Sequence, residues 1–208
     1  MFVALTGTPG TGKTTVAELL SRRGFTVLDV KKLAVENGFI LGSDDERGGS
    51  LIVDTDSLSE WVMKRYGKQG GSENIFGNTD RKDADPSVRP ISENYVFLEG
   101  HVAHLMECCE VVVILRCDPK ILYQRLSSRG WPAKKIEENV DAEALDVILC
   151  EALEYYENGD VFEIDGGTGD PEAAASAIIE LANAEFKKES PDYMLGKFDW
   201  SDYLLEKY

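Results

Sequence analysis

The sequence predicts an α/β domain built around a parallel sheet of five strands that is flanked by helices. Five short apolar runs rich in β-branched residues are typical of strands covered on both faces. Helical patterns separate these runs, and strands that alternate with helices form parallel sheets with right-handed crossovers. We expect strands at residues 2–6, 26–29, 95–99, 111–116 and 161–165, and helices at 14–23, 31–37, 58–66, 119–128, 141–156 and 171–187.

The loop between the first strand and the first helix carries the most specific motif. Residues 7–14 read G-T-P-G-T-G-K-T and match the phosphate-binding pattern G-x-x-x-x-G-K-[ST] in its strand–loop–helix context. Backbone N–H groups of such a loop and the helix N-terminus point at phosphate oxygens. The motif predicts a P-loop that binds a nucleoside triphosphate, ATP, together with Mg²⁺. We expect Lys13 to reach the β- and γ-phosphates, the Thr14 hydroxyl to hold the metal, and the remaining contacts to come from Gly10, Thr11, Gly12 and Thr15.

The third expected strand ends in an acid. Glu99 follows four apolar residues, and the carboxyl end of a parallel sheet is where such folds bind ligands. We therefore expect Glu99 to organise the Mg²⁺ shell with Thr14. His101 follows two positions later, where an imidazole with a pKa of about 6.5 can orient or deprotonate a water or a substrate hydroxyl. His104 is expected to be a core or capping residue.

Phosphoryl transfer also needs positive charge on the transferring group, which arginines on mobile segments supply. Arg125 and Arg129 lie four residues apart, on one face of a helix that leads into Gly130. We expect both arginines to be catalytic and Arg129 to bind the nucleotide as well. Residues 128–138 then form a short lid that can close over ATP.

Composition bears on partners and location. The formal net charge is −16, from 22 Lys and Arg against 38 Asp and Glu. Binding to nucleic-acid phosphates needs clustered cations, so this charge argues against general nucleic-acid binding by the isolated chain. A basic protein partner and an adaptation to solubility or high salt both remain open. The longest aliphatic run, at 111–115, is far shorter than the roughly 20 residues that span a bilayer, and the P-loop lies too close to Met1 for a signal peptide. We expect a cytoplasmic protein with reduced cysteines.

Two stretches stand outside the alternating pattern. Residues 67–92 are rich in Gly, Asn, Asp and Lys and lack apolar periodicity, which indicates an insertion. Residues 190–208 form a tail with many apolar groups, among them Phe198, Trp200 and Tyr203, and such groups seldom stay in water. We expect this tail to fold back on the body or to dock on another chain. The domain proper then spans residues 1–189.

The ordered set of motifs resembles the nucleoside monophosphate (NMP) kinases, and among them the atypical adenylate kinase family numbered isoenzyme six. The matching segments are G-T-P-G-T-G-K-T-T at 7–15, E-G-H at 99–101, L-R-C-D at 115–118, L-Y-Q-R-L at 122–126 and S-R-G-W at 128–131, followed by Lys134, Lys135 and Asn139. The resemblance covers most of residues 1–185. It implies a central P-loop strand, an NMP-binding segment at 29–52 and the lid at 128–138.

The same resemblance implies adenylate kinase activity, ATP + AMP ⇌ 2 ADP, and ATPase activity. It also implies a role in maturation of the small ribosomal subunit through binding of a basic small-subunit ribosomal protein, a partner that suits an acidic chain. Two positions depart from the family pattern. Glu99 stands where Asp is common, and Val35 stands where an Arg is frequent, so that Lys31 or Arg47 would have to bind the AMP phosphate.

Three functions remain open at this point. The first is an adenylate kinase, and the second is an assembly factor in which ATP hydrolysis drives release from a ribosomal protein. The third is a small-metabolite kinase whose acceptor would bind the acidic segment 43–56. His101 distinguishes the first two in part, because an ionised AMP phosphate needs no base, whereas an attacking water uses one.

Overall fold

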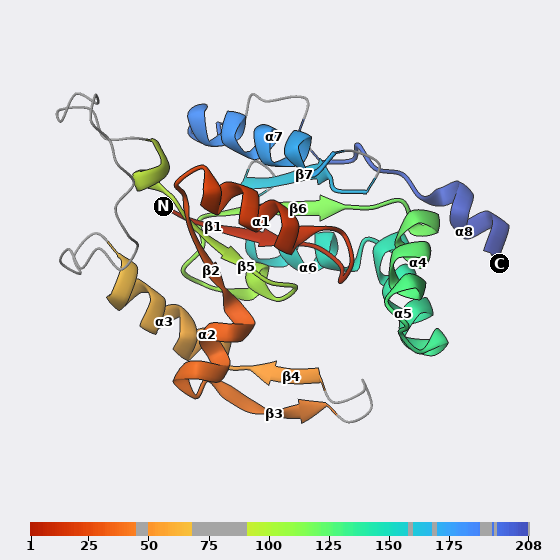
Figure 1. Ribbon diagram of the computed structural model, residues 1–208, viewed down its shortest axis with the longest axis horizontal. Helices are drawn as coiled ribbons and strands as arrows, with labels where there is room; N and C mark the ends of the chain where they lie inside the picture. The colour runs from red at the N-terminus through yellow and green to blue at the C-terminus, as the bar shows by residue number, and fades with distance from the viewer. Residues whose placement is uncertain are drawn as a thin grey trace.

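The computed structural model describes residues 1–44, 50–67, 91–157, 160–167, 170–187, 193 and 195–207. Its centre is a parallel sheet with the strand order β2-β5-β1-β6-β7 (Figure 1). The expected α/β fold with five parallel strands is confirmed, and every strand lies within one residue of its predicted bounds. The strands are β1 (Phe2–Thr6), β2 (Thr26–Asp29), β5 (Val96–Glu99), β6 (Val111–Arg116) and β7 (Val161–Asp165).

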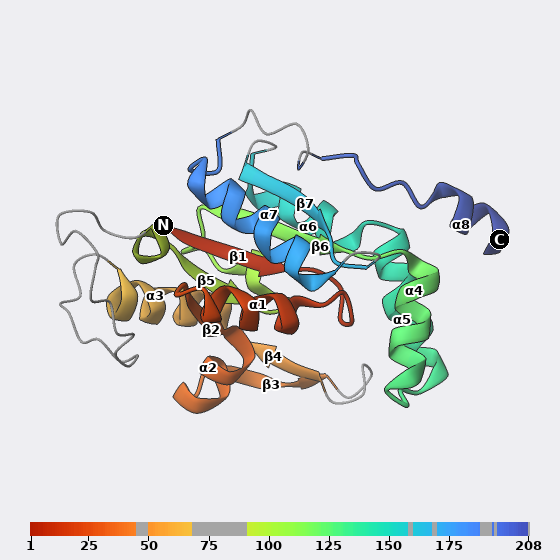
Figure 2. The same cartoon turned by 45° about the horizontal axis from the view of Figure 1, so that its top comes forward.

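Helices cover both faces of this sheet (Figure 2). They are α1 (Lys13–Arg22), α2 (Val30–Asn37), α3 (Thr55–Tyr66), α6 (Val147–Tyr155) and α7 (Pro171–Asn183). Helices α1 and α7 pack on one face, and α2, α3 and α6 pack on the other. Along β1, Val3 and Leu5 contact the first layer and Ala4 contacts the second. Because both faces are buried, most positions of these strands carry an apolar residue, which explains the continuous apolar runs.

Aspartates fix where several helices begin. The carboxylates of Asp29, Asp54 and Asp170 accept first-turn N–H groups of α2, α3 and α7 at 2.9, 3.1 and 3.1 Å. Asp118 does the same for α4 (Pro119–Ser128), whose proline at the first position is already suited to the helix. These caps satisfy N–H groups that the helices themselves leave unpaired.

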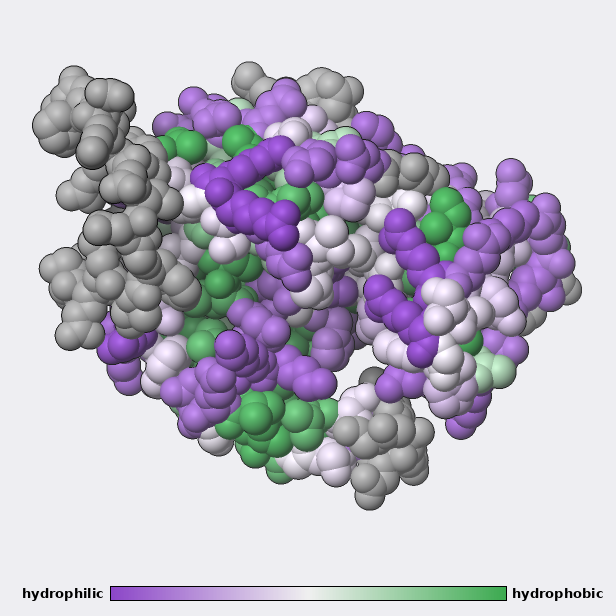
Figure 3. All heavy atoms as spheres, viewed as in Figure 1, coloured by the Kyte–Doolittle hydropathy of each residue, from purple (hydrophilic) through white to green (hydrophobic). Residues whose placement is uncertain are grey.

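The segment 29–52 contains a two-stranded antiparallel sheet that the sequence analysis did not predict. β3 (Ile40–Asp44) pairs with β4 (Ser50–Val53), with an irregularity in register between Ile40 and Gly42. Leu41 and Ile52 are exposed, and Figure 3 shows apolar side chains gathered over this hairpin. Half-exposed strands lack the continuous apolar run that identifies the central strands. The assignment of 29–52 to NMP binding stays a prediction.

The region after Gly130 also differs from the expected helix pattern. Most of the segment 128–138 belongs to α5 (Ala133–Ala144), which packs against α4. The single helix expected at 141–156 is wrong, because α5 ends and α6 begins on either side of Asp146. That residue has a left-handed backbone (φ 56°), and its carboxylate is paired with Arg116. The role of 128–138 as a lid stays a prediction.

The C-terminal residues that the structure describes fold back on the body, which is one of the two expected outcomes. The N–H of Gly196 donates to the buried carboxylate of Glu163 in β7 (2.8 Å). Further along, α8 (Ser201–Lys207) lies beside α4 and α5 (Figure 1), where Lys207 forms an ion pair with Asp141. This segment is therefore part of the folded domain.

The insertion expected at 67–92 lies outside the described residues except at its ends. Gly67 caps α3, and a short 3₁₀ turn (Ile91–Asn94) leads into β5. Within the ranges that the structure describes, no helix is long and apolar enough to cross a bilayer.

Deletion of residues 195–208 is expected to destabilise the body. It removes the Gly196 donor of buried Glu163 and the ring of Phe198, which lies over a buried arginine. Loss of a hydrogen bond to a buried charge corresponds to a fall in melting temperature of about 3 to 10 °C for a domain of this size. Deletion of 201–208 alone removes surface ion pairs and the partly buried ring of Tyr203, and it is expected to lower the melting temperature by less than the longer deletion does. Scanning calorimetry of the three chains checks this, and equal melting temperatures would contradict it.

Candidate active site

The P-loop joins β1 to α1, and glycines with positive φ determine its path. Gly7, Gly10 and Gly12 have φ angles of 139°, 103° and 109°. A Cβ atom at Gly7 would lie 2.4 Å from the carbonyl oxygen of Leu115 in β6, and one at Gly10 would lie 2.8 Å from Leu122 in α4. At Gly7 a side chain would clash with the backbone of β6, and at Gly10 the positive φ disfavours any other residue beside the leucine side chains of α4.

The loop has polar groups that suit a polyphosphate. The hydroxyl of Thr11 is buried and has no hydrogen-bond partner among the described residues. A buried hydroxyl without a partner is unfavourable, and phosphate oxygens would satisfy it. Thr14 and Thr15 are exposed in the first turn of α1, where the helix N-terminus favours anions. The phosphate contacts expected from the motif stay predictions that this geometry fits.

Lys13 is buried against its own loop. Its Nζ donates to the carbonyl oxygens of Gly7 (2.6 Å) and Thr8 (3.1 Å). Burial lowers the pKa of Lys13 to about 8, against the opposing charges of Glu99 and Glu143. A lysine held in this way supplies a positive charge at the inner wall of the loop.

Thr14 and Glu99 lie together, as their predicted joint role requires. The Thr14 hydroxyl donates to Glu99 Oε1 (3.4 Å), and Glu99 ends β5 opposite Leu5 of β1 and Asp29 of β2. Burial raises the pKa of Glu99, while Lys13 and the Thr14 hydroxyl oppose this shift. Hard oxygen donors of this type suit Mg²⁺. The donor set therefore fits the metal that the motif implies.

His101 lies at the same edge of the sheet with an exposed side chain. Partial desolvation lowers its pKa, and the charges of Lys13, Lys31 and Lys135 lower it further. The imidazole is therefore neutral at neutral pH and available as a proton acceptor. The lysines that lower the pKa of His101 belong to three helices, α1, α2 and α5.

His104 has a different environment. It is buried, its Nδ1 lies 3.1 Å from the Thr6 hydroxyl, and its Nε2 lies 3.0 Å from Glu151 Oε2. These contacts connect the end of β1 to α6. They agree with the core role expected for His104.

Arg125 and Arg129 differ in their contacts. The Arg125 guanidinium donates to the carbonyl oxygens of Gly166 (2.9 Å) and Gly167 (2.8 Å), and more weakly to Gly10 (3.3 Å). Arg125 thus ties the P-loop to the turn after β7. Arg129 caps the C-terminal end of α4 with an exposed side chain, and its charge lowers the pKa of Lys13. The catalytic roles of both arginines stay predictions.

Sequence reasoning missed a buried polar group behind the loop. Glu143 of α5 accepts from the Thr8 hydroxyl (2.5 Å), from Arg116 Nε (2.9 Å) and from the backbone N–H of Cys117 (3.0 Å). Arg116 and Thr8 belong to quoted motifs, but no role was assigned to either. Glu143 carries no local signal, because an acid in an amphipathic helix is usually on the solvent face.

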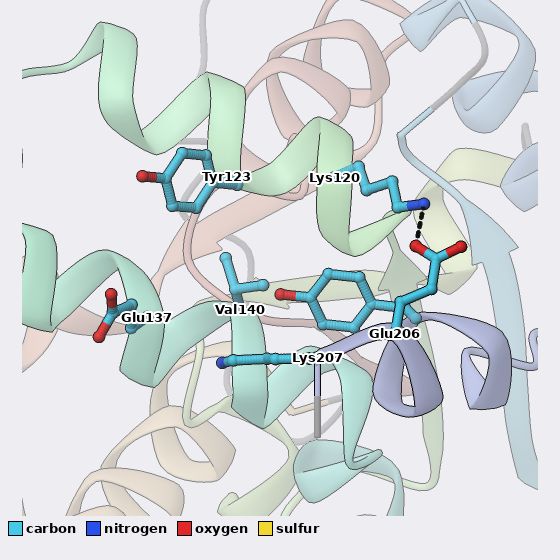
Figure 4. A pocket seen from close by; sticks show the side chains of 7 residues that line it. Lys120, Tyr123, Glu137, Val140, Glu206 and Lys207 are labelled. Carbon is cyan, nitrogen blue, oxygen red and sulfur yellow. Dashed lines mark hydrogen bonds and ion pairs between the residues drawn. The ribbon is translucent and has the colours of Figure 1, made fainter.

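A cavity of about 290 Å³ lies between α4, α5 and α8 (Figure 4). None of its lining residues belongs to the P-loop or to the carboxyl edge of the sheet. They are Lys120, Tyr123, Glu137, Val140, Tyr203, Glu206 and Lys207. The cavity is a consequence of how the C-terminal helix lies on the α4–α5 pair and is separate from the candidate active site.

Comparisons with known proteins show the family to which the chain belongs. A family described as an AAA domain matches residues 3–146. Two relatives described as "Putative adenylate kinase" are 35% identical to the chain, one from Archaeoglobus fulgidus over 207 residues and one from Pyrococcus furiosus over 208. The alignments cover 100% and 99% of this chain and 96% and 94% of the relatives.

A crystal structure of an uncharacterized protein from Eubacterium ventriosum aligns with a TM-score of 0.52 at 11% identity. The alignment covers 88% of this chain and 99% of that one, and it is a likeness of fold alone. The archaeal relatives align with the chain over nearly the whole of both sequences, including the P-loop. The chain therefore belongs to the archaeal adenylate kinase-like family of P-loop proteins.

Proposed function

We propose that the chain is an Mg²⁺-dependent adenylate kinase that catalyses ATP + AMP ⇌ 2 ADP. The observation that carries the proposal is the contact between the Thr14 hydroxyl and the Glu99 carboxylate, beside buried Lys13 at the carboxyl edge of the sheet. Such an arrangement suits phosphoryl transfer. The descriptions of the archaeal relatives supply AMP as the acceptor.

In the proposed reaction an oxygen of the AMP phosphate attacks the γ-phosphorus of ATP in line. The bond to the bridging oxygen breaks, and its electron pair leaves with ADP. The N–H groups of the P-loop bind phosphate oxygens, and Lys13 exchanges its carbonyl acceptors for β- and γ-phosphate oxygens. Thr14 and Glu99 would hold Mg²⁺, which neutralises charge on those oxygens when bound.

Arg129 is the side chain best suited to stabilise the transferring group. It is exposed at the end of α4, and its charge already reaches Lys13. Arg125 holds the carbonyl oxygens of the loop and of the turn after β7, so its charge would act from behind the P-loop. Both arginines add positive charge where the transition state spreads negative charge.

On the acceptor side, α2 and the β3–β4 hairpin would bind AMP. Val35, where the family often carries an Arg, is 54% exposed and has no charge. Lys31 is exposed at the start of α2, and its charge acts on His101 at the site. We therefore assign the AMP phosphate to Lys31. Arg47, the other candidate, lies outside the described residues.

Lys13→Ala is expected to lower kcat for ADP formation by at least about 100-fold, because the charge that follows the phosphoryl group is lost. The far-ultraviolet circular dichroism spectrum is expected to stay the same. Lys120→Ala, which removes an exposed lysine of α4, is the matched control and should retain activity. Near-normal turnover in Lys13→Ala would show that the site is assigned wrongly.

An acceptor panel with MgATP identifies the substrate in the same assay. ADP formation is measured with AMP, with other nucleoside monophosphates, with small metabolites and with no acceptor. The fastest turnover is expected with AMP. A preference for a metabolite would instead support the small-metabolite kinase, whose acceptor would bind the acidic segment 43–56.

An ATPase is the second candidate function, and His101 is the observation that favours it. The imidazole is exposed and neutral at neutral pH, because partial desolvation and the charges of nearby lysines lower its pKa. An attacking water needs a proton acceptor, whereas the AMP phosphate is already ionised. Hydrolysis could then drive release of the protein from a partner, as in an assembly factor.

His101→Ala is expected to lower ATP hydrolysis without acceptor by about 10- to 100-fold and AMP phosphorylation by about threefold or less. His101→Asn keeps a polar side chain without the basic nitrogen and should behave in the same way. Steady-state rates in the two assays check this. Equal losses in both assays would mean that His101 positions ATP or is structural.

The net charge of −16 favours a basic partner, and we propose a small-subunit ribosomal protein in the cytoplasm, with a role in ribosome maturation. The complex is expected to weaken clearly between low and moderate salt, because exposed charges beyond about 10 Å are screened at 0.1 M. Pull-downs with the purified ribosomal protein measure this for the full chain and for a chain without 195–208. The truncation should have little effect, since that segment packs on its own body. Absence of binding at low salt would contradict the partner.

A further inference from the structure

Glu143 connects α5 to the phosphate-binding loop. Its side chain is 3% exposed, and each of its carboxylate oxygens has a separate task. Oε1 accepts from Arg116 Nε and from the N–H of Cys117, at 2.9 and 3.0 Å. Oε2 accepts from the hydroxyl of Thr8, inside the P-loop, at 2.5 Å. The carboxylate is thus fixed on one side by β6 and is bonded to the loop on the other.

Thr8, which donates to Glu143, also accepts a hydrogen bond from Lys13. Thr8 is 2% exposed, its hydroxyl donates to Glu143, and its carbonyl oxygen accepts from Lys13 Nζ. The same carbonyl accepts the N–H of Thr11 (3.2 Å), which closes the turn of the loop. A shift of Thr8 would therefore move both the lysine and the turn that presents the backbone N–H groups.

The loop is held from both helices of the α4–α5 pair. Arg125 of α4 donates to the carbonyl oxygens of Gly10 and Thr11, at 3.3 and 3.4 Å. Glu143 of α5 accepts from the hydroxyl of Thr8. Polar contacts that fix a site from behind set the geometry of groups that touch the ligand. Thr8 and Glu143 do not themselves reach out of the protein.

We propose that Glu143 is a positioning residue for nucleotide binding, which acts through the Thr8 hydroxyl to hold the P-loop in the shape that accepts phosphates. The proposal rests on the proposed function only in that a nucleoside triphosphate or diphosphate is the ligand. It assigns to α5 a part in nucleotide affinity that is separate from any movement of the segment 128–138.

The test compares variants that break the same contact from its two ends. Thr8→Val replaces the hydroxyl with a methyl group of similar shape, and Thr8→Ser retains the hydroxyl. Glu143→Gln keeps one oxygen, which the two donors Arg116 Nε and Cys117 N–H hold, so the amide nitrogen faces Thr8 and the Thr8 hydroxyl loses its acceptor. The dissociation constants for MgATP and MgADP are measured by calorimetry without acceptor, together with melting temperatures and with KM and kcat for ATP.

Thr8→Val and Glu143→Gln are each expected to weaken nucleotide binding about tenfold, which is the usual effect of losing a hydrogen bond to a charged group. Thr8→Ser should restore affinity to within about threefold of the wild type. The double variant should bind no more weakly than Glu143→Gln alone, because the two changes remove one shared contact. The rise in KM for ATP should exceed the fall in kcat.

Glu163→Gln is the matched control. Glu163 is the other buried glutamate paired with Arg116, and its second oxygen accepts from Gly196 and not from the P-loop. This variant should melt at a lower temperature, as Glu143→Gln does, while its nucleotide affinity stays within about twofold of the wild type.

Two results would overturn the proposal. One is an equal loss of affinity in Glu163→Gln and Glu143→Gln, which would mean that the buried cluster acts only through general stability. The other is wild-type affinity in Thr8→Val, a variant that leaves the Arg116 cluster intact. A wild-type chain that binds MgATP but phosphorylates no acceptor would overturn the proposed function alone, because these affinities are compared without acceptor.

Discussion

One buried charge determines how the pieces of this domain meet. Arg116, the last residue of β6, is 1% exposed, and its guanidinium is paired with Glu143, Asp146 and Glu163. Burial alone would lower the pKa of Arg116, but the carboxylates outweigh it and the pKa is raised. A buried charge is tolerated only when it is paired and hydrogen-bonded. The end of α5, the turn before α6 and the strand β7 must therefore all be in place around it.

The carboxylates extend this constraint to the rest of the molecule. Glu143 accepts a hydrogen bond from Thr8 of the P-loop, and Glu163 accepts one from Gly196 of the C-terminal segment. Asp146 explains why one expected helix is two, since its left-handed backbone turns the carboxylate toward Arg116. Arg116 is thus linked through its three carboxylate partners to the phosphate-binding loop, to the break between α5 and α6 and to the C-terminal segment.

The elements that could be predicted from the sequence are those whose structure follows from a local residue pattern. The central strands are buried on both faces and read as continuous apolar runs, and the P-loop requires glycines such as Gly7 where β6 leaves no room for a side chain. The hairpin at 40–53 was missed because its strands are short and half-exposed, with Leu41 outward. Such strands have no periodic signal that separates them from loop.

The contacts behind the loop could not be predicted for a different reason. Thr8 and Glu143 are 135 positions apart, and their bond exists only because α5 packs beside the end of the sheet. Nothing in the neighbourhood of Glu143 distinguishes it from the exposed acids of the same helix. A single sequence cannot show which of the 38 Asp and Glu face inward. The arginine that holds it was visible in a motif, but its partners were not.

A net negative charge of the whole chain does not prevent one edge of the sheet from being cationic. Charges act over about 10 Å at moderate salt, so the −16 total has little meaning at a single point on the surface. At His101 the nearby charges that shift its pKa are cationic, among them Lys13, Lys31 and Lys135. These lysines come from α1, α2 and α5, and the fold brings them to one edge of the sheet. Glu99 lies beside Lys13 at the end of β5, so this edge combines cations that suit phosphate oxygens with a carboxylate that suits a metal ion.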